Sequence, residues 1–72
     1  MNQYFHMRAD LFDKWMIMLL EEAYDWKQIG ISNEYCNRIS IPKCGLGLID
    51  WADRSFKVID EKKYALFLLR YQ

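Results

Sequence analysis

One long amphipathic segment limits what this chain can fold into more than any other feature. Between Asp10 and Ile29, apolar side chains recur at steps of three and four residues, which is the spacing of one helix face. This face consists of Phe12, Met16, Leu19, Ala23 and Trp26. Asp10 is a suitable N-cap, and Gly30 is suited to the position just after a helix. We therefore expect one long helix over residues 10–29, packed on two sides because a second apolar stripe lies beside the first.

Shorter elements are expected in the second half of the chain. Arg38–Ile41 alternates polar and β-branched residues before the only proline, which predicts a short strand. A glycine loop over 43–48 follows, and Asp50 is suited to cap a helix over 51–61. The apolar segment Tyr64–Tyr71 fits a buried strand or a helix, and we favour the strand because of the order of the elements before it.

Taken in order, these elements predict a small α+β fold in which helices lie against a short layer of strands. The chain 1–72 shows no repeat, no low-complexity tract and no sign of a boundary, so we expect a single small domain. The polar segment 31–37 is expected to form a loop or a short turn before the first strand. An all-α fold is the alternative, because the last segment also fits a continuation of the preceding helix.

Charge and cysteine content exclude several classes of function. Ten basic and ten acidic residues give no net charge, so no basic excess is available to bind a nucleic-acid backbone. The longest apolar run, Trp15–Leu20, is far shorter than a membrane span. Cys36, Cys44 and a distant His6 are too few for a zinc site, so we expect no metal. Without a recognisable signal peptide, we expect reduced thiols and a cytoplasmic location.

Small size and aromatic content together indicate a role in protein interaction. A domain of this length buries only about 60% of the surface that its unfolded chain exposes, so its core is marginal. Aromatic residues make up 17% of the sequence, which is more than so small an interior can enclose. We therefore assign a partner-binding face to Tyr4, Phe5, Trp15 and Trp26. The partner would be a larger protein or, in a homodimer, a second copy of the chain.

The same reasoning predicts a non-enzymatic protein. No group of residues has the spacing of a catalytic set, and His6 is expected to be a surface or helix-entry residue. Very small neutral proteins are often inhibitors of host enzymes or defence systems, made by phages or mobile elements. We therefore expect an inhibitor of this kind, and we expect it to need no cofactor.

One segment resembles a known family. Residues 39–51, which read ISIPKCGLGLIDW, are similar to the strand, loop and helix signature of the macro domain, the ADP-ribose-binding family. The resemblance is degenerate and covers only the C-terminal half of that domain, and the string is two residues shorter than usual. It implies that Cys44, Gly45, Leu46 and Gly47 wrap the diphosphate of ADP-ribose. The alternative function is therefore an ADP-ribose or nucleotide-phosphate binding module.

The sequence allows two interpretations of Cys44. A position beside the N-terminus of a helix would lower the pKa of its thiol and make it reactive. Its apolar neighbours fit equally well a small buried residue with no chemical role.

Overall fold

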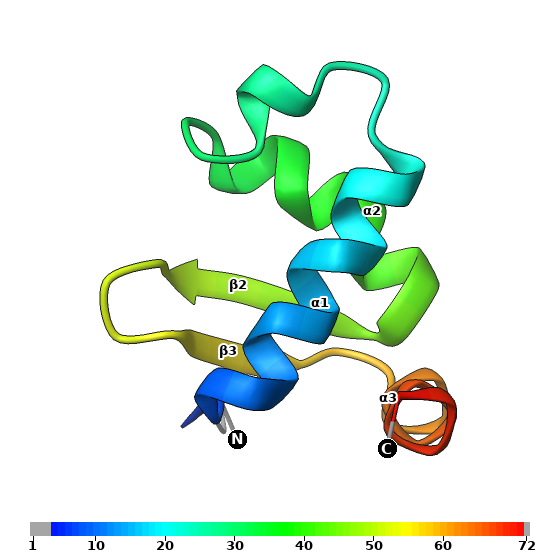
Figure 1. Ribbon diagram of the computed structural model, residues 1–72. Coiled ribbons are helices and arrows are strands. Elements are labelled where there is room, and N and C mark those ends of the chain that lie inside the picture. The colour runs from blue at the N-terminus through cyan, green and yellow to red at the C-terminus, as the bar shows by residue number, and fades with distance from the viewer. Residues whose placement is uncertain (1–3, 72) are drawn as a thin grey trace.

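Figure 1 shows the computed structural model, which describes residues 4–71. Helices and strands both occur in this part of the chain, so the expected α+β class is confirmed. The elements in chain order are β1 (Tyr4–His6), α1 (Ala9–Glu22), the 3₁₀ turn η1 (Trp26–Gln28), α2 (Asn33–Cys44), β2 (Leu46–Asp50), β3 (Ser55–Val58) and α3 (Glu61–Arg70).

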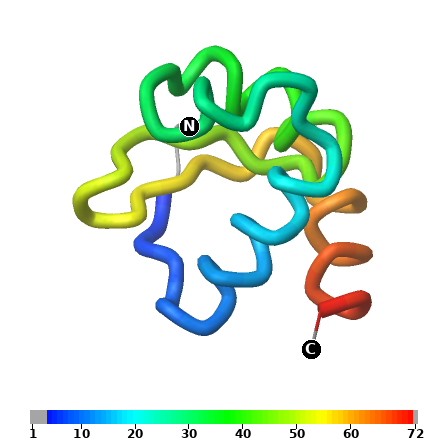
Figure 2. Tube along the Cα trace, turned by 45° about the horizontal axis from the view of Figure 1, so that its top comes forward, coloured from blue at the N-terminus to red at the C-terminus, as the bar shows by residue number. Residues whose placement is uncertain are grey.

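The described strands form one antiparallel sheet in the order β1-β3-β2. Phe56 is at its centre, because Phe5 of β1 and Leu48 of β2 lie directly opposite it on either side. α1 packs across one face of the sheet, where the Trp15 and Phe56 rings meet edge to face at 4.7 Å. Figure 2 shows α2 and β1 at opposite edges of the sheet.

α1 is shorter than the helix expected over residues 10–29. It begins at Ala9, so Asp10 lies in the first turn and does not cap it, and it ends at Glu22. The side chain of Asp25 then accepts a hydrogen bond from the backbone N–H of Lys27, which starts η1 as a separate turn. The apolar periodicity persists past the end of the helix, although Trp26 itself is exposed.

α2 replaces the loop expected over 31–37 and the strand expected over Arg38–Ile41. Ser32 caps it by accepting a hydrogen bond from the backbone N–H of Tyr35, and Pro42 lies inside its last turn. The alternation suggested that the two isoleucines would be buried and Ser40 exposed. In α2 the polar Ser40 is instead the fully buried residue of this segment. A period of two in four residues was therefore a misleading signal.

The remaining expected boundaries are also displaced. The glycine loop expected over 43–48 is divided between the end of α2 and the start of β2. The helix expected over 51–61 is a turn followed by β3, and Asp50 accepts from the backbone N–H of Ala52 inside that turn. The segment expected as a strand over Tyr64–Tyr71 lies mostly in α3, which Asp60 caps through the N–H groups of the residues two and three positions on.

Candidate functional site

The two outer edges of the sheet differ, because the edge of β2 is covered by side chains of α2. Asn37 accepts a hydrogen bond from Leu48 N at 2.7 Å and donates to Leu48 O at 3.4 Å. One turn before it, Asn33 donates to Ile49 O at 3.0 Å, and one turn after it, Ser40 donates to Leu46 O at 2.6 Å. These three side chains take the place of a further strand along β2.

The Asn37 contacts also reveal which backbone groups face the other edge. Because the N–H and C=O of Leu48 point at α2, Leu48 and Phe56 form a non-hydrogen-bonded pair, and the backbone groups of Phe56 point at β1. Phe5, directly opposite, therefore uses its own groups to bond β3. It follows that the N–H and C=O groups of Tyr4 and His6 point outward, and no strand within residues 4–71 pairs with this edge.

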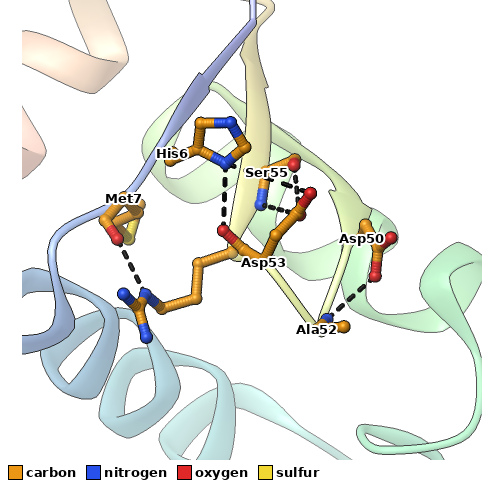
Figure 3. Close-up of polar contacts among 7 residues, drawn as sticks. His6, Met7, Asp50, Ala52, Asp53 and Ser55 are labelled. Carbon is orange, nitrogen blue, oxygen red and sulfur yellow. Dashed lines mark hydrogen bonds and ion pairs between the residues drawn. The ribbon is translucent and has the colours of Figure 1, made fainter.

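β1 is tied to the turn between β2 and β3 at its C-terminal end (Figure 3). Met7 N donates to Arg54 O at 2.8 Å, and Arg54 Nε donates back to Met7 O at 2.9 Å. Next to this exchange, His6 Nδ1 lies 3.1 Å from the carbonyl oxygen of Asp53. Carbonyl oxygens only accept, so Nδ1 carries the proton of the neutral ring and Nε2 is left as an acceptor. The open edge therefore belongs to a strand fixed by side-chain and backbone contacts.

His6, Asp53 and Ser55 have the residue types of a hydrolytic triad but a different order of contacts. The Ser55 hydroxyl and backbone N–H both donate to the Asp53 carboxylate, which holds the turn (Figure 3). The Ser55 hydroxyl bond is the main cause that lowers the pKa of Asp53, and the nearby His6 adds to it. Ser55 is also buried, so it does not present a nucleophile to solvent.

A cleft of about 580 Å³ lies beside β1, between the first half of α1 and α3. Its apolar lining comes from Phe5, Leu11, Tyr64, Leu68 and Tyr71, and its polar lining from His6, Arg8, Asp10 and Lys14. Lys14 Nζ donates to the carbonyl oxygen of Tyr71 across it, and Arg8 forms a double hydrogen bond with Asp10. A strand added to β1 would place every second side chain on the Phe5 side of the sheet, next to this cleft.

The predicted partner-binding residues do not share one face. Tyr4 and Trp26 are exposed, at 62% and 65%, but Tyr4 lies on β1, before α1, and Trp26 lies in η1, after the C-terminal end of α1. Phe5 is half-buried in the lining of the cleft. Trp15 cannot contact a partner, since it is completely buried and its Nε1 donates to Ser40 Oγ. Trp15 lies in α1 and belongs to the hydrophobic core.

The predicted phosphate-binding residues lie at the C-terminal end of α2 and at the start of β2. Cys44 is the last residue of α2, so Gly45 sits at the negative end of a helix, which repels phosphate. Gly45 is a left-handed cap with φ of 70°, and its N–H donates to Ile41 O. Leu46 and Gly47 lie in β2, and Gly47 pairs with Lys57. The strand, loop and helix order implied by the macro-domain resemblance is therefore not found at these residues.

Both cysteine thiols are buried, which lowers their reactivity. Burial raises the pKa of Cys36 and of Cys44, which is the opposite of the shift expected at a helix N-terminus. Eight positions on one helix correspond to about 12 Å of axial rise, which is beyond disulfide reach. Cys44 is therefore a small buried core residue and does not have the lowered pKa of a reactive thiol.

The His, Cys, Asp and Glu side chains of residues 4–71 do not gather in any group of three that could hold a metal ion. No helix in the described residues has the length and apolar content to cross a membrane. Comparisons of the chain with protein-family models, with curated proteins and with solved structures found no match.

Sequence reasoning missed the residues that make the two edges unequal. Asn33, Asn37 and Ser40 recur at steps of four and three, as one stripe of a helix does, and Ser32 before them is a good N-cap. The helical spacing was present in the sequence, although the same residues also fit the expected loop over 31–37 and strand over 38–41. The outward-facing backbone of His6 left no signal in the sequence, because it depends on the register of three strands.

Proposed function

We propose that this protein is a non-enzymatic interaction protein that binds another protein by taking an extended segment of it onto the outer edge of β1. One observation carries the proposal: side chains of α2 satisfy the edge of β2, whereas the outward backbone groups of Tyr4 and His6 pair with no strand of residues 4–71. An edge of this kind is a template for a further strand.

Two features support β1 as a binding strand. Its contacts with Arg54 and Asp53 hold it in an extended shape before any partner arrives, which reduces the entropy lost on binding. The adjoining cleft offers an apolar lining for side chains of the added segment, while the backbone supplies the hydrogen bonds. An inhibitor that docks on a larger protein, as expected from the size of the chain, would use this same surface.

The test is selection of binders from a displayed library of short random peptides, followed by amide chemical-shift mapping on the full chain. Selected peptides are expected to shift the amides of Tyr4 and His6 more than that of Phe5, because only the first two point outward. Tyr4→Pro removes one outward N–H, and Tyr4→Ala, the matched control, removes the side chain and keeps the N–H. Binding should fall at least tenfold in the proline variant relative to the alanine variant.

Two results would overturn the proposal. One is a library that yields no binder to the folded chain at a concentration at which the chain is monomeric. The other is a set of binders that shift amides elsewhere and bind the proline and alanine variants equally well. Circular dichroism of both variants shows whether the fold is intact, so that a loss of binding is not confused with unfolding.

A further inference from the structure

We infer that the strand which occupies the open edge is β1 of a second copy of this chain, so that two molecules form a homodimer with one continuous antiparallel sheet. The inference rests on the proposed function and names its partner. It is carried by the pattern of outward backbone groups, the side chains at those positions and the charge of the chain.

The backbone pattern of β1 is self-complementary. Tyr4 and His6 are two residues apart, and each presents an N–H and a C=O to the open edge. When a second β1 runs antiparallel about a two-fold axis at Phe5, Tyr4 faces His6 of the second copy and His6 faces its Tyr4. Both are hydrogen-bonded pairs, and the two Phe5 residues form the non-hydrogen-bonded pair between them.

This register makes the fullest use of the described strand. An axis at Tyr4 or at His6 would bring together only one pair of outward residues from the segment Tyr4–His6, with half the hydrogen bonds. The axis at Phe5 brings together two such pairs. It also places the two Phe5 rings on the side of the sheet where the cleft of each copy lies.

Side chains at the facing positions are compatible with the pairing. The Tyr4 ring is 62% exposed and the His6 ring is also exposed, and in one chain they already meet edge to face at 6.2 Å. His6 Nε2 is an acceptor when the ring is neutral, and the Tyr4 hydroxyl of the second copy is a donor of matching kind. A chain with ten basic and ten acidic residues has no net charge to oppose its own association.

The first experiment measures molecular mass by light scattering over a series of concentrations. The mass is expected to rise from 8.8 kDa toward twice that value. The double variant Tyr4→Lys with His6→Lys places like charges directly opposite each other and should weaken the dimer at least tenfold. The matched variant Tyr4→Glu with His6→Lys places opposite charges there and should restore it.

The second experiment fixes the register by disulfide trapping with Tyr4→Cys and His6→Cys. Facing residues are about 5.5 Å apart, within disulfide reach, whereas Tyr4 lies more than about 8 Å from Tyr4 of the second copy. A mixture of the two variants should therefore form the mixed disulfide, and neither variant alone should crosslink with itself. The native thiols do not interfere, because Cys36 and Cys44 are buried.

The outcomes separate this inference from the proposed function. A mass of one chain at every concentration, with no mixed disulfide, overturns the homodimer. Self-crosslinking of either single variant, or a dimer indifferent to the charge variants, also overturns it. If selected peptides still shift the Tyr4 and His6 amides of a monomeric chain, the proposed function stands without the homodimer. If they do not, both fall.

Discussion

Trp15 Nε1 donates a 2.8 Å hydrogen bond to Ser40 Oγ in the fully buried interior, and this contact joins α1 to α2. The same hydroxyl donates to Leu46 O, so one serine connects both helices with the start of β2. A buried polar group without a partner is costly, so Trp15 Nε1 and Leu46 O both depend on the Ser40 side chain.

Ser40→Ala is expected to destabilise the fold, because it leaves Trp15 Nε1 and Leu46 O buried without this partner. The free energy of unfolding should fall by about 1–3 kcal/mol, measured by urea denaturation. Ser32→Ala, which removes the cap of the same helix, is a useful comparison with an expected cost of about 1 kcal/mol. A neutral Ser40→Ala would show that the hydroxyl does not stabilise the core.

Asn37→Ala is expected to uncover the edge of β2. The Leu48 amide, which donates to Asn37 Oδ1 at 2.7 Å, should exchange its hydrogen with solvent faster than in the unchanged chain. Asn37→Asp keeps the acceptor for this N–H and should retain more of the protection. Equal exchange rates at Leu48 in all three proteins would contradict the role assigned to Asn37.

Gly45→Ala is expected to be the most damaging of the simple glycine changes. Its φ is 70°, and an added Cβ would meet the backbone oxygen of Asp60 at 2.2 Å. The left-handed backbone alone costs a non-glycine residue about 1–2 kcal/mol, and the backbone clash adds to it. Gly30→Ala is the control, since an added Cβ there meets nothing within 4 Å. Thermal unfolding of the two variants should therefore differ clearly, with Gly45→Ala melting much lower.

The thiols of Cys36 and Cys44 are expected to react slowly with a thiol-specific reagent such as DTNB at pH 8. Burial shields both side chains and raises their pKa values, so little thiolate is present. Labelling should then follow the rate of opening and become fast in denaturant. Immediate labelling of the native protein would contradict this burial.

The raised pKa of the Cys44 thiol also makes the stability of the fold depend on pH in the alkaline range. A thiol whose pKa is higher in the folded chain than in the unfolded chain favours folding less and less as the pH rises above the unfolded value of about 9. Cys44→Ser, which does not ionise in this range, should reduce the decline in stability between pH 8 and pH 10. An unchanged slope would show that Cys44 makes no contribution to it.

Some features of the fold were predictable from local patterns. The apolar face of α1 was recognised because its periodicity extends over several turns, and two of its predicted members, Phe12 and Leu19, pack in the core. The α+β class was predicted correctly, although neither expected strand, Arg38–Ile41 nor Tyr64–Tyr71, is a strand in the structure. Of the candidate site, only Tyr4 and Phe5 were predicted, because both are aromatic and the sequence has an excess of aromatic residues. The outward backbone groups could not be predicted, because they depend on the register of the sheet.

By itself, the sequence indicated the α+β class, an apolar face on the first helix and the exposure of two of the four aromatic residues assigned to the partner face, Tyr4 and Trp26. It did not place any strand correctly. Only the tertiary structure decided that 38–41 is helical, that Tyr64–Tyr71 belongs mainly to a helix and that Trp15 is buried. Short apolar segments have similar intrinsic preferences for helix and strand, so long-range contacts such as that of Asn37 with Leu48 decide between them. The same tertiary structure places β1 at the edge of the sheet, where no strand of residues 4–71 pairs with its outer side.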